Sequence, residues 1–487
     1  MKKKKVVSLV LAVTMALSMV ACGSSDGNSS SSDSSSSSSN SDTPLVIGWD
    51  AMSQKFSPFF AESHSDMYLD DKLVQIGLIG IDRSGQYILD GIDGYTSEYN
   101  GTEYTYYTPS KVEVVENSDG SVDYNIQIRD DINFSDGVNV TIDDVIFSMY
   151  VVSDPTYDGP STFASLPILG IDEYKSGVST LTTLLVEAGR DNSDFTNWTE
   201  EQQEAFWSAV DTEGTAFAQS IVDYCAENGY VDSSEDVTDA AAAWGFELAD
   251  GATATDFFTA IGDAYDWNFT SMDTEAASVT LADTLPEDVL AMSTTGIETG
   301  DSAANIEGIV KTGDYSMTLK LTEFSAPAIE KLSIDIAPMH YYGDESLYDY
   351  DNNQFGFTKN DLSIIRDKTT QPLGAGPYKF VEYSNKTAYL EANEDYFLGA
   401  PSIKNIQFKE TQEADKIPGV VQGTIDLSEP SISKANVEQI SSENSNGELV
   451  GDVLTTTLAD NLGYGYIGMC SLNVKVGDDP SSEQSKD

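Results

Sequence analysis

One stretch of the chain constrains its fold more than any other: a run of alternating residues that leads into a helix start. Between positions 122 and 128 every second residue is apolar and the residues between them are polar, which is the period of a half-buried strand. A preceding apolar run at 112–115 is separated from it by Asn-Ser-Asp-Gly at 117–120, residues that favour a tight turn. The two runs therefore predict a β-hairpin.

A turn and a helix are predicted directly after this hairpin. The pair Asp136-Gly137 is typical of a turn. Thr141, three residues before Asp144, has the form of a helix N-cap followed by acid in the first turn, where the helix dipole favours negative charge. Apolar residues from Val145 to Tyr150 then supply a buried face. All of these residues are predicted to be scaffold.

The same run resembles the signature of the family 5 extracellular solute-binding proteins, the receptors of oligopeptide and dipeptide ABC transporters. In that family a strand ending in Leu-Arg is followed by Phe-Ser-Asp-Gly, a short gap and Thr-Ala-x-Asp-Val. Ile142 departs from the pattern, because the family favours Ala there. The matching residues are Ile128, Arg129, Phe134, Ser135, Asp136, Gly137, Thr141, Asp144 and Val145.

A second match lies at residues 372–380. It contains Gly374, Gly376, Pro377 and Tyr378, and its glycines predict close approach of two backbone segments. Further segments at 393–397 and 423–427 resemble the family as well, so the resemblance extends over residues 45–470. It implies an α/β fold of the periplasmic-binding-protein type II kind, with two lobes and an extra small subdomain.

The N-terminus reads as a secretory signal. Lys2–Lys5 precede an apolar stretch at 6–20, and Ala21-Cys22 with the residues after it resembles a bacterial lipobox. Met19 stands where that motif favours Leu. The resemblance implies that Cys22 is lipidated and holds the protein at the outer face of the cytoplasmic membrane, as in Gram-positive bacteria; an uncleaved membrane anchor is the alternative. The Ser-rich segment that follows has nothing to bury and predicts a flexible linker.

Composition excludes several classes of function. The formal charge is −56, from 25 basic and 81 acidic residues, which disfavours nucleic-acid binding because phosphate neutralisation needs basic clusters. His64 and His340 are the two histidines, and no nucleophile, zincin or Walker motif is present. We therefore expect no enzymatic activity, no cofactor and no metal. Cys225 and Cys470 either pair or, as we favour, are buried separately.

The predicted ligand contact lies after the first strand, Leu45–Trp49. By resemblance, the loop at Phe56, Ser57, Pro58 and Phe59 touches ligand largely through its backbone, although Ser57 stands where the family has Asn or Asp. The aromatic residues of this loop form either core or cleft wall.

Seven segments are expected along the chain. Residues 172–305 form a mainly helical insertion beyond the family pattern, with a capping box at Thr199–Gln202 and helices near 240–244 and 257–265. A contact with a partner or with the cell wall is the alternative interpretation of this insertion. The segments are a signal peptide at 1–21, Cys22 with its linker at 22–43, the start of lobe I at 44–80, a small subdomain at 81–171, the insertion at 172–305, the rest of lobe I at 306–475 and the start of a second large lobe at 476–487. By resemblance, the chain ends where that second lobe opens, so the lobe is expected to be largely absent.

The sequence thus predicts a monomeric, lipid-anchored substrate-binding component of an ABC importer that delivers oligopeptides to permease subunits. A binding protein for a nickel or haem complex or an oligosaccharide, and a surface adhesion or sensing protein, are the alternatives.

Overall fold

The computed structural model describes residues 43–457. The predicted signal, Cys22, the Ser-rich linker, Cys470 and the segment that follows residue 475 lie outside the described residues. Within residues 43–457, no helix combines the length and the apolar character needed to cross a membrane.

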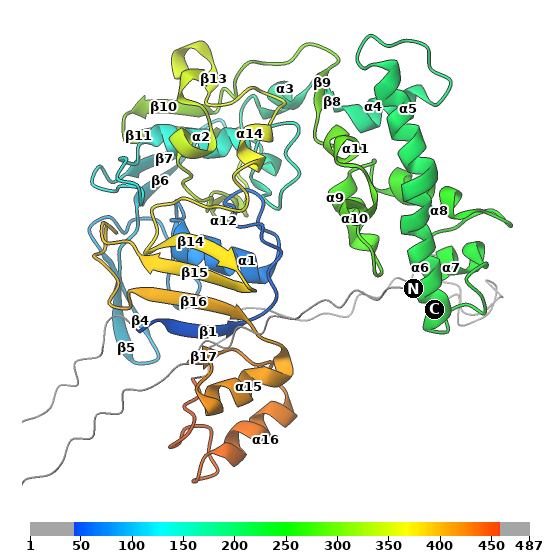
Figure 1. The fold of residues 1–487 in the computed structure, drawn as a ribbon. Coiled ribbons are helices and arrows are strands. Elements are labelled where there is room, and N and C mark those ends of the chain that lie inside the picture. The colour runs from blue at the N-terminus through cyan, green and yellow to red at the C-terminus, as the bar shows by residue number, and fades with distance from the viewer. Residues whose placement is uncertain (1–42, 458–487) are drawn as a thin grey trace, which may run out of the picture. The chain divides into compact units, whose positions relative to one another are not determined.

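A five-stranded sheet is built from the two ends of the described chain, in the order β14-β15-β16-β1-β17 (Figure 1). The predicted first strand is confirmed in this sheet, where β1 lies between β16 and the edge strand β17 and runs parallel to both. The other pairs are antiparallel. The strand bounds are β1 Leu45–Trp49, β14 Tyr378–Ser384, β15 Thr387–Ala392, β16 Asn405–Glu410 and β17 Leu427–Ser428.

Helical turns cover this sheet and extend beyond it. Helix α1 and the π-helical turn η1 contribute Leu69 and Val74 to a core with Phe56 and the strands β1 and β14–β16. Helices α15 and α16 pack on one another through Ile417 and Ile440. The bounds are α1 His64–Leu69, η1 Asp70–Val74, α15 Glu413–Gln422 and α16 Lys434–Glu443.

The predicted hairpin and helix are confirmed in a four-stranded antiparallel sheet of order β10-β11-β7-β6. Helix α2 packs its apolar residues into the large core under this sheet. The predicted capping box is present, since Thr141 and Asp144 cap α2 reciprocally. The bounds are β6 Ser110–Glu116, β7 Val122–Ile128, α2 Ile142–Val151, β10 Ile309–Gly313 and β11 Ser316–Leu321.

Strand pairing joins two of the predicted segments. Strands β10 and β11 lie in the range 306–475 that the sequence predicts for the first lobe, yet β11 pairs along its whole length with β7 of the small subdomain. Antiparallel pairing can join segments that are distant in the sequence, as Ser316 and Gln127 are. The alternation of apolar and polar residues predicts a strand but not which strand it pairs with.

Residues between β8 and β9 form a mainly helical unit with a core of its own. The two strands pair antiparallel, so the unit begins and ends at the same place. The predicted capping box at Thr199 and Gln202 is confirmed, and Cys225 is fully buried as predicted. The bounds are β8 Val178–Thr180, α4 Leu181–Ala188, α5 Glu200–Ala209, η3 Val210–Gly214, α6 Thr215–Glu227, α7 Val237–Ala243, α8 Ala254–Ala264, α9 Phe269–Met272, η4 Asp273–Glu275, α10 Leu281–Thr284, α11 Glu287–Met292 and β9 Gly296–Glu298.

Short elements complete the chain. Their bounds are β2 Gly80–Ile81, β3 Tyr87–Ile88, β4 Tyr95–Tyr99, β5 Thr102–Tyr106, η2 Phe163–Ser165, α3 Ile171–Lys175, α12 Ala328–Lys331, α13 Met339–Tyr342, η5 Glu345–Leu347, β12 Tyr348–Asp349, η6 Tyr350–Asn352, β13 Gln354–Phe355 and α14 Ser363–Arg366.

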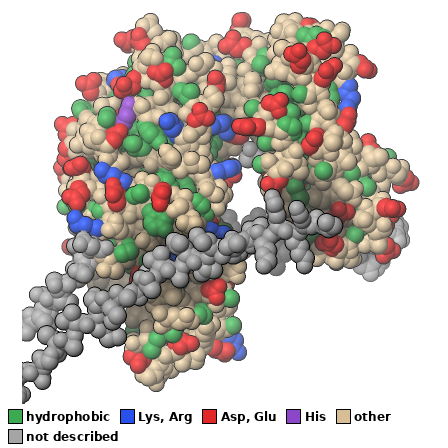
Figure 2. All heavy atoms as spheres, viewed as in Figure 1, with side chains coloured by type: hydrophobic (Ala, Val, Ile, Leu, Met, Phe, Trp, Pro, Cys, Tyr) green, Lys and Arg blue, Asp and Glu red, His purple; other side chains and the backbone are tan. Residues whose placement is uncertain are grey.

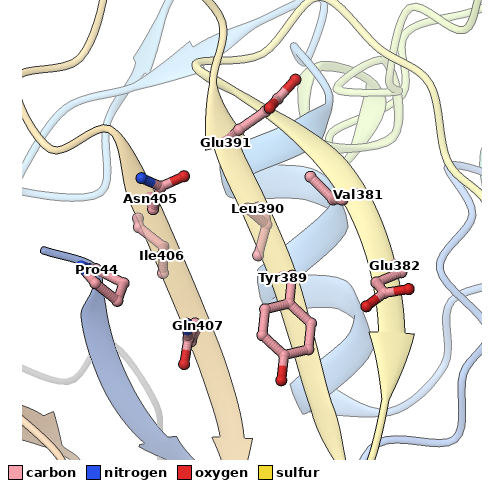
Figure 3. Close-up of a pocket in the computed structure, with 9 residues that line it drawn as sticks. All are labelled: Pro44, Val381, Glu382, Tyr389, Leu390, Glu391, Asn405, Ile406 and Gln407. Carbon is pink, nitrogen blue, oxygen red and sulfur yellow. The ribbon is translucent and has the colours of Figure 1, made fainter. Parts of the chain in front are cut away.

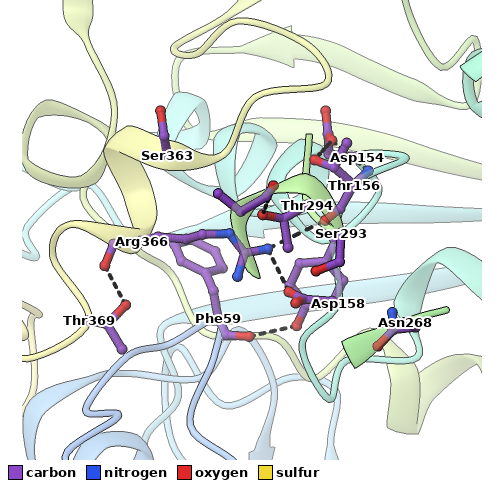
Figure 4. A network of polar contacts seen from close by, with 12 residues as sticks. Phe59, Asp154, Thr156, Asp158, Asn268, Ser293, Thr294, Ser363, Arg366 and Thr369 are labelled. Carbon is purple, nitrogen blue, oxygen red and sulfur yellow. Dashed lines mark hydrogen bonds and ion pairs between the residues drawn. The ribbon is translucent and has the colours of Figure 1, made fainter. Parts of the chain in front are cut away.

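A polar network fastens the segment after α2 to helix α14 (Figure 4). The Arg366 guanidinium lies 2.5 Å from Asp158 Oδ1 and stacks 4.4 Å from the centre of the Phe60 ring. Asp154 Oδ2 accepts a hydrogen bond from the backbone of Asn360, whose carbonyl in turn accepts one from Gly296 in β9. These two hydrogen bonds therefore connect the base of the helical unit, through Asn360, to the segment after α2.

Candidate functional site

Three parallel strands end around one pocket. β1 ends at Trp49, β16 at Glu410 and β17 at Ser428, and the residues that follow each strand line a pocket of about 270 Å³. In open α/β sheets, ligands bind outside the carboxyl ends of the strands, where such loops converge. The lining residues are Trp49, Asp50, His64, Glu413, Lys416, Glu429, Pro430, Ser431 and Ile432.

Lys416 is the cation at the centre of this pocket. Its side chain is only 5% exposed, and its Nζ lies 2.7 Å from Asp50 Oδ1 and 3.1 Å from Glu413 Oε2. It also donates to the backbone carbonyl of Glu429 at 3.0 Å. Burial works to lower the pKa of Lys416, but the hydrogen bonds and charges of Asp50 and Glu413 raise it above its ordinary value. Lys416 therefore stays charged while it joins helix α15 to the loops after β1 and β17.

Glu413 organises the opposite side of the pocket. Its Oε1 accepts hydrogen bonds from the backbone nitrogen of Ser431 at 2.7 Å, from Ser431 Oγ at 2.6 Å and from Asn436 Nδ2 at 2.9 Å. The hydrogen bond from Ser431 is the main reason that the pKa of Glu413 falls to about 2. A fixed carboxylate thus holds the loop after β17 against α15 and α16.

Aromatic side chains form one wall. The Trp49 ring stacks on His64 with centroids 5.9 Å apart and lies 5.0 Å from Tyr68. The Trp49 indole is buried, and its Nε1 has no hydrogen-bond partner among the described residues. Ile432, on the loop after β17, is 93% exposed. The pocket therefore combines fixed charges with apolar surface, which is typical of small-ligand sites.

The loop between β1 and α1 is held by a buried carboxylate. Asp66 is fully buried, and its Oδ2 accepts hydrogen bonds from Ser53 N at 3.1 Å, from Ser53 Oγ and from Lys55 N at 3.3 Å. These hydrogen bonds hold the loop that follows Asp50, and Asp50 lines the pocket.

The predicted ligand loop lies in the two hydrophobic cores. Phe56 is fully buried against Phe380 and Tyr383, and Phe59 is buried against Phe147 and Tyr342. The sequence left open whether these aromatic residues form core or cleft wall, and in the structure they form core. Ser57 is buried and Pro58 is half-buried, and none of the four lines the pocket. Contact of this loop with ligand stays a prediction.

The signature residues are structural. Asp144 accepts from Thr141 N at 2.9 Å and from Met339 N at 3.0 Å, which joins α2 to the segment before α13. His340 Nε2 lies 2.7 Å from Asp136 Oδ2 in the adjoining turn. The remaining signature residues lie in the core, in turns or at close backbone contacts: Phe134, Ser135, Gly137, Val145, Gly374, Gly376, Pro377 and Tyr378.

Close backbone approach explains the glycines of the second match. A Cβ on Gly374 would lie 2.2 Å from the carbonyl oxygen of Val74, and one on Gly376 would lie 2.5 Å from that of Leu73. The predicted low-bulk backbone at this position is confirmed.

A second hollow of about 380 Å³ lies over β14, β15 and β16 (Figure 3). Its lining comes from Pro44 and from side chains of one sheet, including Tyr389 and Gln407. It has neither loops converging from several strand ends nor a buried charge. We therefore assign the candidate site to the pocket around Lys416.

Sequence reasoning missed Asp50, Glu413 and Lys416. The local signal was weak, since Glu413 and Lys416 are one i,i+3 pair among many charged residues. Acidic side chains are spread over the visible face of the molecule (Figure 2), so acidity alone did not single them out. A strand followed directly by an acid, as at Trp49-Asp50, was the available clue.

The fold is of the α/β class, and the candidate pocket lies at the carboxyl ends of three of its parallel strands. The model of the bacterial extracellular solute-binding proteins, family 5, matches residues 235–477. The chain belongs to this family of solute-binding transport proteins. The match covers the second motif and part of the helical unit, while the signature at 128–148 lies before it.

Individual relatives are similar over parts of their length. The chain is 30% identical over 123 residues to the oligopeptide-binding protein AppA of Bacillus subtilis, which is 24% of this chain and 20% of AppA. The crystal structure of that AppA with a nonapeptide matches 79% of this chain and 43% of its own, with 15% identity and a TM-score of 0.35. The substrate-binding protein CtaP of Listeria monocytogenes matches 82% of this chain and 47% of its own, with 13% identity and a TM-score of 0.40. The chain thus spans less than half the length of each of these proteins.

Proposed function

We propose that this chain is the substrate-binding component of an ABC importer, and that it binds oligopeptides in the pocket around Lys416. Family membership supports the transport role. The observation that carries the proposal is the convergence of three parallel strand ends on fixed charges of both signs, Lys416 and Glu413, beside the Trp49 wall.

Peptide chemistry fits this pocket in three ways. A peptide carries a cationic amino terminus, which the exposed carboxylates of Asp50 and Glu429 can pair with. Its side chains offer apolar surface for Trp49 and the exposed Ile432. Within the described residues β17 is the edge strand of its sheet, and extended peptides are recognised by backbone pairing at such an edge. The oligopeptide-binding name of the relative AppA is consistent with this proposal.

The test uses the exposed loop residue Ile432, because its substitution leaves buried contacts intact. Calorimetric titration of the full chain with a random oligopeptide pool is expected to give micromolar binding, weakened several-fold by Ile432→Ser. Val450→Ser, at an apolar residue that is 56% exposed, is the matched control and is expected to bind as wild type. Absence of binding to any peptide, with an oligosaccharide or metal complex found by mass spectrometry of the purified protein, would reject the peptide assignment.

We also propose that Cys22 carries the lipid that holds the protein at the outer face of the cytoplasmic membrane, from which it delivers ligand to permease subunits as a monomer. Membrane fractionation of Cys22→Ser tests the anchor. Release of the variant into the medium is the expected result, and retention in the membrane would favour an uncleaved apolar segment.

A further inference from the structure

Three carboxylates from distant segments meet beside the turn η1. Asp70 and Asp71 open this turn, and Asp335 lies in the segment after α12. One carboxylate oxygen from each lies within 4.8 Å of the other two. A β-bridge between Gly77 and Asp335 holds the two segments together. This cluster is separate from the pocket around Lys416.

Buried acceptors at this cluster lack donors. Asp70 is fully buried, and while its Oδ1 accepts from Gln75 Nε2 at 3.2 Å, its Oδ2 has no hydrogen-bond partner within residues 43–457. Gln75 is 2% exposed, and its Oε1 also has no partner in that part of the chain. Buried polar atoms are normally satisfied, because each unpaired one costs free energy of about 1–3 kcal/mol. A cation bound between the three carboxylates would satisfy the unpartnered oxygen of Asp70.

The described chain does not supply that group. No Lys, Arg or His side chain within residues 43–457 forms an ion pair with Asp70, Asp71 or Asp335. Lys72 is exposed, and its charge influences the cluster without forming an ion pair.

We propose that Asp70, Asp71 and Asp335 bind a hard divalent cation, of the calcium or magnesium class. All three donors are oxygen, which such cations prefer. Asp71 and Asp335 are half-buried rather than closed off, so the ion can enter and keep water ligands. A bound cation would tie η1, whose Val74 belongs to the core of the five-stranded sheet, to the segment of Ile334 and Ile336 in the large core.

A shared proton is the competing way to satisfy the cluster. Saturable binding of a divalent cation that depends on Asp335 separates the two.

The test first removes metal from the full chain with a chelator. The protein is then titrated with calcium chloride and, separately, with magnesium chloride at constant ionic strength. Calorimetry at pH 7.5 is expected to give one site with a dissociation constant of about 10⁻⁴–10⁻³ M for one of the two ions. The thermal unfolding midpoint is expected to rise with that ion at pH 7.5. Asp335→Asn is expected to weaken binding at least tenfold, whereas Asp351→Asn, at an exposed acid, is the matched control and is expected to bind as wild type.

Two results would overturn the cation site: no saturable binding of either ion at pH 7.5, or equal binding by wild type and Asp335→Asn. If Asp335→Asn does not fold, Asp71→Asn gives the same comparison at a half-buried position.

Discussion

Lys416 Nζ lies 2.7 Å from Asp50 Oδ1, so a buried lysine of α15 meets the first residue after β1. These residues are 366 positions apart in the chain, and their contact defines the floor of the candidate site. Lys416 makes two further contacts, to Glu413 and to the carbonyl of Glu429.

Replacing this lysine is expected to affect both stability and binding. Lys416→Met keeps the length of the stem and removes the charge, which leaves three acceptors without their donor. We expect unfolding free energy to fall by about 1–3 kcal/mol and peptide affinity to fall at least tenfold. Chemical denaturation and calorimetry measure the two effects. Lys434→Met, at a lysine that is 88% exposed and pairs with Glu438 at 3.5 Å, is the matched control. Equal effects of the two variants would contradict a central role for Lys416.

The pH dependence of stability is expected to report Asp144. Burial is the largest influence on this carboxyl and raises its pKa to about 6, although backbone nitrogens of Thr141 and Met339 act in the opposite direction. Because the folded-state pKa lies above the unfolded one, the stabilising contribution is complete below about pH 4 and is lost as pH rises through 6. A shift of about two units corresponds to about 3 kcal/mol at most.

Asp144→Asn removes this titration. As pH rises from 4 to 7, the unfolding free energy of wild type is therefore expected to fall relative to that of the variant. Denaturation at several pH values measures it. A difference that stays constant over this range would show that Asp144 does not titrate there.

Close backbone contact at Gly374 is expected to make this position intolerant of a side chain. The methyl group of Gly374→Ala would overlap the carbonyl oxygen of Val74 at 2.2 Å and the buried side chain of Gln75 at 2.4 Å, so there is little room to relax. A loss of about 1–3 kcal/mol or more is expected in chemical denaturation. Gly300→Ala is the control, since the nearest atom to its Cβ is 3.5 Å away. A wild-type midpoint for Gly374→Ala would contradict the observed geometry.

The helical unit is expected to be energetically distinct from the candidate site. Its core includes the fully buried Phe217 and contains none of the residues that line the pocket. Phe217→Ala is expected to cost about 3–5 kcal/mol and to leave peptide affinity unchanged. Phe195→Ala, at a ring that is 37% exposed, should cost far less. Reduced affinity in folded Phe217→Ala would instead indicate coupling between the unit and the pocket.

Local patterns predicted much of the secondary structure. Alternation in 122–128 and the Thr141–Asp144 cap specify a strand and a helix start through contacts within a few residues, and both are present. The need for glycine at 374 and 376 was also readable, because glycine is favoured where two backbones approach closely.

The site was decided by contacts that no local pattern encodes. Phe56 and Phe59 have the same apolar character in a core and in a cleft wall, and only the packing of Phe380, Tyr383, Phe147 and Tyr342 around them selects the core.

By itself, then, the sequence determined the α/β class, the family and the elements whose hydrogen bonds join residues close to one another in the sequence. Tertiary structure decided which strands are neighbours, which aromatic residues are buried, and that Asp50, Glu413 and Lys416 share one pocket. The physical reason is that burial and charge pairing depend on segments hundreds of residues apart, whose proximity is fixed only when the sheet is assembled.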